Sequence, residues 1–396
     1  MANLSAFKLP RAVVTLGLVS LFTDLSSEMI IPLLPAFLTS QLGASATFFG
    51  LIEGAAETTA ALLKLASGAW SDRMDRRRPL VLFGYGLSAM SRPVMALCTQ
   101  PWHALVVRIS DRVGKGLRSA PRDALLAASI PTESHGWAFG FHRSMDHAGA
   151  MLGALLATVF LQLGCTTRQV FWIAAIPGVF AVIAILLGVK EAKGAASGAV
   201  SPRAKLSWSA QPQELKGFLT MLAIFTLANS SDSFLLLKAG EVGIPLPLVP
   251  LLWIVLHITK ALTNLVGGRW SDRLGALPVI RCGWLVYGVV YFLFGFASAA
   301  WQIWALFVCY GLYHGLTEGA EKSLVARFGL PGQKGSAFGL YHAVCGIVAL
   351  PASVFTGLMW QHLGSRWALT ACGGIALVAA TGLSLLGDRS TPIADS

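Results

Sequence analysis

Twelve apolar segments, each long enough to cross a lipid bilayer, constrain the fold of this chain more than any other feature. A transmembrane helix needs about 20 mostly apolar residues, and such runs follow one another along the whole sequence. We therefore predict an all-α integral membrane protein with twelve transmembrane helices. The predicted spans are residues 12–38, 46–70, 79–99, 101–124, 137–163, 168–189, 214–238, 247–270, 277–298, 301–325, 335–361 and 365–387.

The composition agrees with this class. Of the 396 residues, 55% are hydrophobic and 12% are charged, whereas about 25% of the residues of a soluble domain are charged. The formal net charge of +11 is compatible with nucleic-acid binding, but the basic residues cluster in alternate loops, as they do in membrane proteins. The six cysteines lie singly in apolar segments, so the sequence predicts neither a disulfide framework nor a zinc site.

Basic residues divide the loops between the spans into two alternating sets. One set is rich in lysine and arginine, whereas the opposite loops hold only Arg168, Lys238 and Arg366. By the positive-inside rule the basic loops are cytoplasmic, and an even number of spans then places both termini in the cytoplasm. We expect a multi-pass protein of the cell (inner) membrane. The basic loops are residues 73–78, 190–216, 269–281 and 327–334.

A polar segment in the middle of the chain separates two groups of six spans. It runs from Lys190 to Glu214 and is rich in Gly, Ala, Ser and Lys, which is typical of a flexible linker. The predicted organisation is an N-terminal six-helix bundle at 1–190, a cytoplasmic linker at 191–213 and a C-terminal six-helix bundle at 214–396.

Three short motifs recur in the same order in the two halves, which indicates an internal duplication. In transporters built from two repeated bundles, the binding site lies at the interface of the repeats, near the bilayer midplane. The pairs are GAWSDR (68–73) and GRWSDR (268–273), AFGFH (138–142) and AFGLYH (337–342), and SSE (26–28) and SSD (230–232).

The segment GAWSDRMDRRRP, together with twelve spans and a basic central linker, resembles the major facilitator superfamily. The signature of that family, between helices 2 and 3, has the form G-x-x-x-D-R-x-x-R-R. The resemblance covers essentially the whole chain. It implies two pseudo-symmetric six-helix bundles in which helices 1, 4, 7 and 10 line a central cavity. The matching positions are Gly68, Asp72, Arg73, Arg76 and Arg77, and the second copy keeps Gly268, Asp272 and Arg273.

In the family this signature is taken to latch the outward-facing state, and the resemblance predicts the same role here. Gly68 would let two helices approach closely, and Asp72 would place a fixed negative charge at a helix end. In the second copy, Asp272 and Arg273 would take part in the latch. The alternative is that the arginines only hold the loop on the cytoplasmic side.

The stretch VVRISDRVGKGLRSAPRDALLA puts many charges into the fourth predicted span. A charge at the bilayer centre costs at least about 2.5–3.5 kcal/mol, so these residues are expected to face a cavity or a partner. Arg108, Arg112 and Lys115 are spaced i, i+4 and i+7 on one helix face, which would look into the central cavity. Nearer the cytoplasm, Arg118 and Arg122 are expected to bind lipid headgroups or to close an inner gate.

The basic residues inside the spans favour an organic anion or zwitterion as the substrate. Arginine's fork suits a carboxylate or a phosphate, so Arg108 and Arg112 are the first candidates, and Lys260 of the eighth span is another. Further polar candidates lie in the seventh and tenth spans. The predicted substrate-binding residues are Arg108, Arg112, Lys260, Asn229, Asp232 and His314.

Three acidic residues are candidates for proton coupling. Asp24 and Glu28 lie one turn apart on one face of the first span, and the repulsion between two nearby carboxylates favours uptake of a proton. Glu57 is the third candidate. His142, Asp146 and His147 of the fifth span could bind a metal. Intramembrane histidines more often satisfy hydrogen bonds, and no metal site is predicted.

No nucleotide-binding motif, cofactor fingerprint or catalytic-triad spacing is recognised. We therefore predict a secondary active transporter that works by alternating access, without enzymatic activity and without a cofactor. The expected partners are a small-molecule substrate, protons and membrane lipids. We expect a monomer that binds no nucleic acid.

Two alternative functions stay open. The run DLSSEMIIPLLPAFL resembles the first-helix signature of drug–proton antiporters, which would export amphipathic cations with Asp24 and Glu28 as counter-charges. The Gly-rich fifth-helix motif of those exporters is missing, although Gly149 and Gly153 form a GxxxG pair typical of close helix packing. The second alternative is a transporter-like sensor that binds its ligand without moving it, and the absence of an appended soluble domain argues against it.

Overall fold

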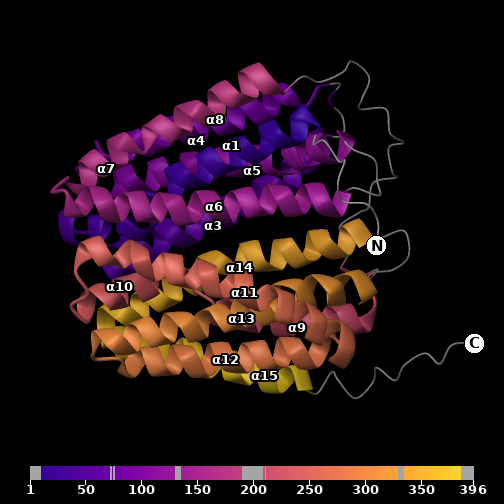
Figure 1. The fold of residues 1–396 in the computed structure, drawn as a ribbon. Helices are drawn as coiled ribbons and strands as arrows, with labels where there is room; N and C mark the ends of the chain where they lie inside the picture. Colours follow the sequence, from indigo (N-terminus) through magenta and orange to yellow (C-terminus); the bar gives the residue numbers. More distant parts are fainter. Residues whose placement is uncertain are drawn as a thin grey trace, which may run out of the picture. The chain divides into compact units, whose positions relative to one another are not determined.

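The computed structural model describes residues 10–71, 74, 76–129, 135–189, 208–209, 211–328 and 334–384, and the regular elements within them are helical (Figure 1). The first part of the chain forms α1 (Arg11–Glu28), η1 (Ile31–Leu33), α2 (Leu34–Ala36), η2 (Phe37–Gln41), α3 (Ala46–Ser71), α4 (Arg78–Met95), α5 (Pro101–Ala128), α6 (His135–Gln162), α7 (Thr167–Ile173) and α8 (Ala175–Gly188). The second part forms α9 (Gln213–Ala228), α10 (Ser233–Glu241), η4 (Leu246–Leu248), α11 (Val249–Leu274), α12 (Ala276–Phe296), α13 (Ala300–Phe328), α14 (Lys334–Leu363) and α15 (Ser365–Ser384).

In the described part of the chain, these elements combine into twelve helical stretches of membrane length, which confirms the predicted fold class. The first stretch joins α1, η1, α2 and η2. The sixth joins α7 and α8, the seventh joins α9 and α10, and the eighth joins η4 and α11. Each of the others is a single helix. All twelve begin and end within a few residues of the predicted spans.

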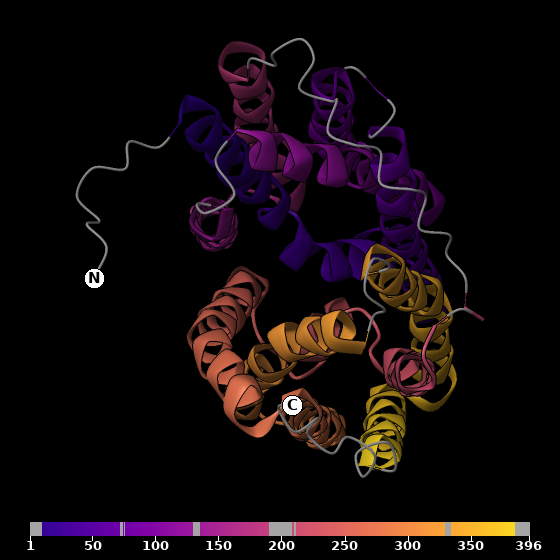
Figure 2. The same cartoon turned by 90° about the vertical axis from the view of Figure 1, so that its right-hand side faces the viewer.

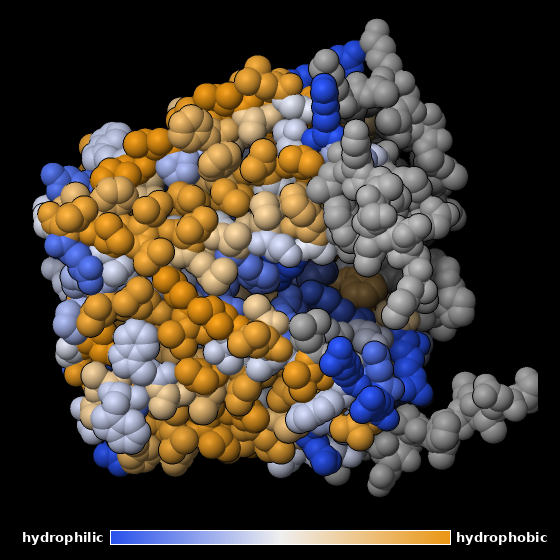
Figure 3. All heavy atoms as spheres, viewed as in Figure 1, coloured by the Kyte–Doolittle hydropathy of each residue, from blue (hydrophilic) through white to orange (hydrophobic). Residues whose placement is uncertain are grey.

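The lengths and compositions of these stretches suit a lipid environment. Among the described residues, eight stretches are long and apolar enough to cross a membrane, and α3, α4, α5 and α13 are more polar. Figure 3 shows hydrophobic side chains over the outer surface of α8, where Ile176, Val179 and Phe180 are exposed. A large apolar surface of this kind is typical of a face that contacts lipid.

Contacts between Cα atoms divide the chain into two compact units. The first unit contains residues 1–33 and 62–200, and the second contains residues 34–61 and 201–396. Within each unit the helices run alongside one another (Figures 1 and 2). The helix α3 therefore begins in the second unit and ends in the first. This grouping follows contacts and does not test the predicted boundaries of the two six-helix halves, which stay a prediction.

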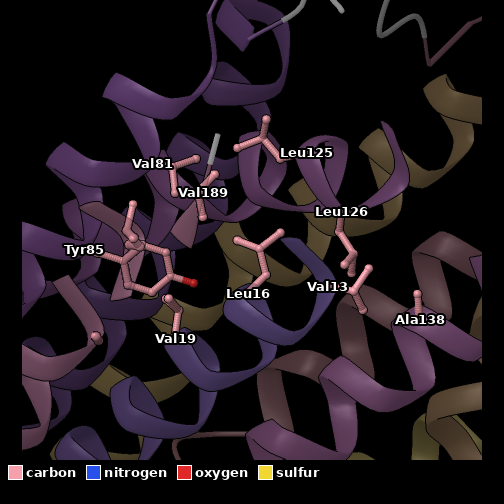
Figure 4. Close-up of a cluster of buried hydrophobic side chains, with 11 residues drawn as sticks. Val13, Leu16, Val19, Val81, Tyr85, Leu125, Leu126, Ala138 and Val189 are labelled. Atoms are coloured by element: carbon pink, nitrogen blue, oxygen red, sulfur yellow. The ribbon is translucent and has the colours of Figure 1, made fainter. Parts of the chain in front are cut away.

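A cluster of apolar side chains packs the first unit (Figure 4). In it Leu16 of α1 is fully buried, as is Val81 of α4, and Tyr85 of α4 lies beside them. Lipid tails are as apolar as these side chains, so close van der Waals packing rather than exclusion from water holds such a cluster together. The other labelled members are Val13, Val19, Leu125, Leu126, Ala138 and Val189.

The helix α6 approaches α1 closely at the predicted glycine pair. A Cβ atom added at Gly149 would overlap the carbonyl oxygen of Leu21, and one added at Gly153 would overlap that of Leu25. No side chain larger than glycine fits at these two positions unless the helices move apart. The predicted GxxxG packing is therefore confirmed.

Replacement of Gly149 by alanine is expected to destabilise the protein by about 1–3 kcal/mol, because the added methyl group overpacks the contact between α1 and α6. The melting temperature of the purified protein measures the effect. Gly140→Ala, on the same helix, is the matched control, since a Cβ there has no heavy atom within 4 Å. Equal melting temperatures for the two variants would contradict the prediction.

Candidate functional site

Four buried arginines lie in the same region of the first unit as one aspartate, Asp111. Arg108, Arg112 and Arg118 lie on α5 and Arg92 lies on α4, and each is 5–6% exposed. The Nε atom of Arg92 is 3.8 Å from Oδ1 of Asp111. The charges of Arg108, Arg112 and Arg118 also act on Asp111. We call these five residues the basic cluster.

Close packing of α4 against α5 positions the cluster. A Cβ atom at Gly84 would lie 2.6 Å from the carbonyl oxygen of Gly114, so the two backbones are almost in contact. The hydroxyl of Ser88 on α4 donates a hydrogen bond of 3.0 Å to the carbonyl oxygen of Asp111. The small residues therefore hold the two arginine-bearing helices at a fixed separation.

Arg118 is part of the interior of the first unit. Its guanidinium group donates a hydrogen bond of 2.7 Å to the hydroxyl of Ser88 and lies over the ring of Tyr85, 4.3 Å from the ring centroid, which is a cation–π contact. The expectation that Arg118 binds lipid headgroups is therefore wrong, because its buried guanidinium group already contacts Ser88 and Tyr85 inside the protein. The neighbouring Arg122 pairs with Asp123, 2.8 Å away.

A pocket opens beside the basic cluster, between the end of α1, η1, α4 and α5. Arg92, Arg108 and Asp111 line it, together with the hydroxyl-bearing Ser27 and Ser91. The other lining side chains are apolar. The cavity volume is about 20 Å³, which is room for about one water molecule and far below the size of a small-molecule site, so a solute would enter only if the pocket widens.

The predicted basic face of α5 is maintained in part. Arg108 and Arg112 are buried, whereas Lys115 is exposed. The charge of Lys115 acts on Asp24 of α1, as do the charges of two members of the basic cluster. Asp24, a predicted coupling residue, therefore lies near Arg92 and Arg118 of the basic cluster, neither of which was a predicted substrate-binding residue.

The predicted pair of coupling carboxylates lies near the end of α1. Asp24 and Glu28 are one turn apart on that helix. Asp24 also interacts with a carboxylate on a different helix, Asp146 of α6, which the sequence did not indicate. Asp146 accepts a hydrogen bond from the hydroxyl of Ser20 and lies 3.6 Å from Nδ1 of His142.

In the second unit, the seventh helical stretch is interrupted at its centre. The helix α9 ends at Ala228, Asn229 leaves the helical conformation with φ −85° and ψ 72°, and α10 begins at Ser233. Discontinuous helices of this kind bring polar backbone groups and charged side chains into the interior of many transporters. The interruption coincides with the SSD motif.

Asp232, in this interruption, is the centre of a polar cluster. The hydroxyl of Tyr310 on α13 donates a hydrogen bond of 2.5 Å to Oδ1 of Asp232. The Oδ2 atom of Asp232 is 3.8 Å from Nζ of Lys260 and 3.9 Å from Nε2 of His314. Asp232, Lys260 and His314, which the sequence predicted separately on three spans, are thus brought together. We call these four residues the Asp232 cluster.

Tyrosines complete the Asp232 cluster, and the sequence analysis missed them. Tyr313 accepts a hydrogen bond of 3.1 Å from the side chain of Asn229. Tyr287 of α12 donates one of 2.9 Å to the carbonyl oxygen of Ala228, which α9 leaves without an intrahelical partner. The available signal was the spacing of Tyr310, Tyr313 and His314 within one turn of a single span.

A second buried carboxylate lies further along α13. Glu321 accepts hydrogen bonds from the indole of Trp284, at 3.1 Å, and from the hydroxyl of Tyr341, at 2.8 Å. The three residues come from α13, α12 and α14. Because both donors are buried, we assign this group to the stability of the second unit rather than to substrate binding.

The predicted latch residues are described only in part. Asp72 and Arg73 lie outside the described residues. Arg76 is exposed and Arg77 precedes the first residue of α4. A Cβ atom at Gly68 would meet Ala120 at 3.6 Å, an ordinary contact distance. The structure therefore does not support the steric reason that was predicted for a glycine at this position.

The remaining predicted site residues lie on exposed parts of the two units. Asp272 and Arg273 are in the last turn of α11, and Glu57 is exposed on α3. Within the described part of the chain, no group of three or more His, Cys, Asp and Glu residues is arranged to hold a metal ion.

The sequence is similar to those of known membrane proteins. The sequence matches the Major Facilitator Superfamily over residues 16–256 and 216–395. It is 33% identical over 388 residues to an uncharacterised MFS-type transporter of Methanocaldococcus jannaschii, and the match covers 96% of this chain and 95% of the relative. It is 25% identical over 353 residues to the multidrug resistance protein MdtH of Photorhabdus laumondii, covering 87% and 84%.

Among solved structures, the chain resembles a bacterial homologue of the human lysosomal transporter Spinster. The TM-score is 0.77 at 14% sequence identity, and the similarity covers 98% of this chain and 100% of the other. This similarity shows the fold alone. The chain belongs to the Major Facilitator Superfamily.

Proposed function

We propose that this protein is a proton-coupled secondary transporter of a small organic anion. The observation that carries the proposal is the basic cluster: four buried arginines act on a single aspartate, and two of them, Arg92 and Arg108, line a pocket with it. In this region the four arginines outnumber the acidic residues Asp111 and Asp24, which act on them. A carboxylate or phosphate substrate would offset this excess.

The chemistry of arginine specifies the kind of solute. A guanidinium group is planar, always charged and able to donate two parallel hydrogen bonds to a carboxylate or phosphate. Arg108 lines the pocket itself, and its apolar neighbours Ile30, Met95 and Val107 would contact a hydrocarbon part of the solute. The proposed substrate therefore combines one anionic group with a small apolar body, and a zwitterion is included because Asp111 also lines the pocket.

We propose that the Asp232 cluster assists substrate binding or proton coupling. Lys260, predicted as a substrate residue, lies within ion-pair distance of Asp232, so its charge is offset inside the second unit. We propose that Asn229 and His314 contribute polar contacts to the substrate. Asp24, Glu28 and Glu57 remain the proposed proton-coupling residues, and Asp24 interacts electrostatically with Arg92 and Arg118 of the basic cluster.

The proposal also includes the membrane location, the topology and the oligomeric state of the protein. We propose a monomer in the cell (inner) membrane with both termini in the cytoplasm, surrounded by lipid and without a nucleic-acid partner. The positive-inside distribution of lysine and arginine supports this topology. The latch role of Gly68, Asp72, Arg73, Arg76, Arg77, Asp272 and Arg273 belongs to the same proposal.

The alternative is a drug–proton antiporter that exports amphipathic cations. The relative called a multidrug resistance protein favours it, as does the first-helix run that contains Asp24 and Glu28. In this alternative the acidic residues would bind the cation. The basic cluster argues against it, because a cation would have to approach an excess of arginines.

Binding of candidate solutes to the purified protein tests the proposal. We expect small carboxylates and organic phosphates to raise the melting temperature, and we expect Arg112→Ala to abolish the increase because it removes one buried guanidinium from the cluster. Arg281→Ala is the matched control, since Arg281 is exposed on α12. The panel includes zwitterions and lipophilic cations and is run at two pH values.

The outcomes separate the two functions. Stabilisation by anions that is lost in Arg112→Ala and retained in Arg281→Ala supports the anion transporter. Stabilisation by lipophilic cations that is lost in Asp24→Asn and retained in Arg112→Ala would overturn it in favour of the antiporter.

A further inference from the structure

One exposed face of α11 changes from apolar to basic along the helix. Ile258, Leu262 and Val266 are 44%, 66% and 43% exposed. Arg269 and Arg273, in the last two turns, are also exposed. Because successive residues of a helix are about 100° apart around its axis, these five side chains lie within about 80° of one another. The same face therefore carries apolar side chains along its length and two guanidinium groups at its C-terminal end.

The basic end of this face coincides with the expected surface of the membrane. Residues 269–281 form one of the basic loops that the positive-inside rule places in the cytoplasm. Trp270 is 47% exposed beside this face, and tryptophan is enriched at the level of the lipid headgroups. A rise of 1.5 Å per residue places Ile258 about 16 Å from Arg269 along the axis. This length is close to the hydrocarbon thickness of one leaflet, which is about 15 Å.

The two arginines are spaced to bind one phosphate group together. Arg269 and Arg273 are one turn apart, so their side chains are neighbours on the helix surface. A guanidinium group donates two parallel hydrogen bonds to a phosphate. Asp272 is exposed as well, but it lies about 100° from Arg273 around the helix axis. The basic end of the face thus attracts an anionic group rather than a cationic one.

We propose that this face of α11 binds one anionic phospholipid of the cytoplasmic leaflet. Arg269 and Arg273 bind the headgroup phosphate, Trp270 lies at the level of the headgroup, and Leu262 and Val266 contact an acyl chain. A zwitterionic headgroup binds less tightly, because the two guanidinium groups repel its cationic end. The inference rests on the proposed membrane topology and does not involve the transported solute.

The internal duplication distinguishes the parts of this site. At the equivalent positions of α3, in the first copy of the repeat, Leu62 and Trp70 are likewise exposed, by 45% and 51%. The residue equivalent to Arg269 is Ala69, however. The apolar side chain and the tryptophan are therefore common to both copies, whereas this arginine is specific to the second. This difference favours α11 over α3 as the helix that selects an anionic lipid.

Native mass spectrometry of the full-length protein in detergent measures lipid binding directly. The probes are phosphatidylglycerol, phosphatidylcholine with the same acyl chains, and glycerol 3-phosphate, which has a phosphate but no acyl chain. We expect phosphatidylglycerol to bind about tenfold more tightly than phosphatidylcholine, because two basic residues attract its charge. We expect glycerol 3-phosphate not to bind at the same concentrations, since the apolar part of the face contributes to affinity.

Three variants make the test specific to this face. Arg269→Ala should weaken the binding of phosphatidylglycerol about fivefold and leave that of phosphatidylcholine unchanged. Leu262→Ser should weaken both lipids to the same extent, because it removes a contact with the acyl chain. Arg327→Ala is the matched control and should bind both lipids like the wild type. Arg327 is exposed in the last turn of α13, but Ser323 and Gly319 precede it on its face instead of large apolar side chains.

Three results would overturn the inference. The first is equal affinity of the wild type for the two phospholipids. The second is an equal loss of phosphatidylglycerol binding in Arg269→Ala and Arg327→Ala, which would show that only the net charge of the protein matters. The third is binding of glycerol 3-phosphate as tight as that of phosphatidylglycerol, which would assign the arginines to a soluble phosphate.

The lipid test and the solute-binding panel are independent of each other. Arg273 is also a proposed latch residue, so the lipid test changes Arg269, which is not. A protein that selects phosphatidylglycerol but is not stabilised by any small anion would retain the lipid site and lose the proposed substrate class. The opposite result would retain the substrate class and lose the lipid site.

Discussion

Asp111→Asn is expected to destabilise the first unit by about 3–5 kcal/mol, the typical cost of removing one partner from a buried set of charges. Asp111 is the carboxylate around which four arginines gather, and each of them is 5–6% exposed. Asparagine has nearly the same shape but no charge. The arginines would then repel one another in an environment too apolar to screen them. The loss is read as a fall in the melting temperature of the purified protein.

A matched control is available on the same helix. Asp123 pairs with Arg122, but its side chain is 40% exposed, so Asp123→Asn should change the melting temperature little. If the basic cluster binds anions, a high concentration of sulfate or of a small carboxylate should restore part of the stability lost in Asp111→Asn. Equal melting temperatures for the two asparagine variants would contradict the assignment of Asp111 as the common counter-charge.

The second large effect is expected for Asp232→Asn. This change removes the charge that accepts the hydrogen bond of Tyr310 and lies beside Lys260, and hydrogen bonds to charged groups contribute about 1.5–3 kcal/mol each. Lys260 would also lose the carboxylate that lies 3.8 Å from its Nζ atom. We therefore expect a fall in melting temperature and a loss of transport.

A double variant separates the two effects of this change. Asp232→Asn combined with Lys260→Met removes both charges, so we expect it to regain stability but not transport. Glu318→Gln, which breaks a surface pair with Lys322 on α13, should leave the melting temperature nearly unchanged. A double variant that is as unstable as the single one would show that the ion pair with Lys260 is not the source of the instability.

The sequence predicted the helices of this protein because membrane spans are encoded locally. About 20 apolar residues in a row identify a span without any knowledge of its neighbours. Even the charged span that became α5 was recognised, since its ends are apolar. The GxxxG spacing of Gly149 and Gly153 likewise depends on one helix only, and the structure confirms the close contact that it predicted.

The partners of the charged residues could not be predicted in the same way. Arg92 and Asp111 meet because Gly84 and Gly114 bring two helices together, and nothing in either span indicates that register. Glu53 of α3 accepts hydrogen bonds from Ser231 and Ser233, which are 178 and 180 residues away in the chain. Tyr310 was indistinguishable from the packing aromatics around it until its hydroxyl was placed beside Asp232. The sequence thus identified many of the charged residues, but not the hydrogen bonds that determine their roles.

The polarity of four helices has a consequence for how the protein is made. On the scale that describes insertion by the translocon, an arginine or aspartate near the centre of a helix opposes transfer into the bilayer by about 2.5–3.5 kcal/mol. The helix α5 carries several such residues and is unlike the eight stretches that are apolar enough to enter lipid alone. The helix α4 is made first, and its Arg92 lies beside Asp111 of α5, so we expect the two helices to leave the translocon together as a hairpin. Biogenesis of this transporter is then expected to depend on pairs of helices rather than on single ones.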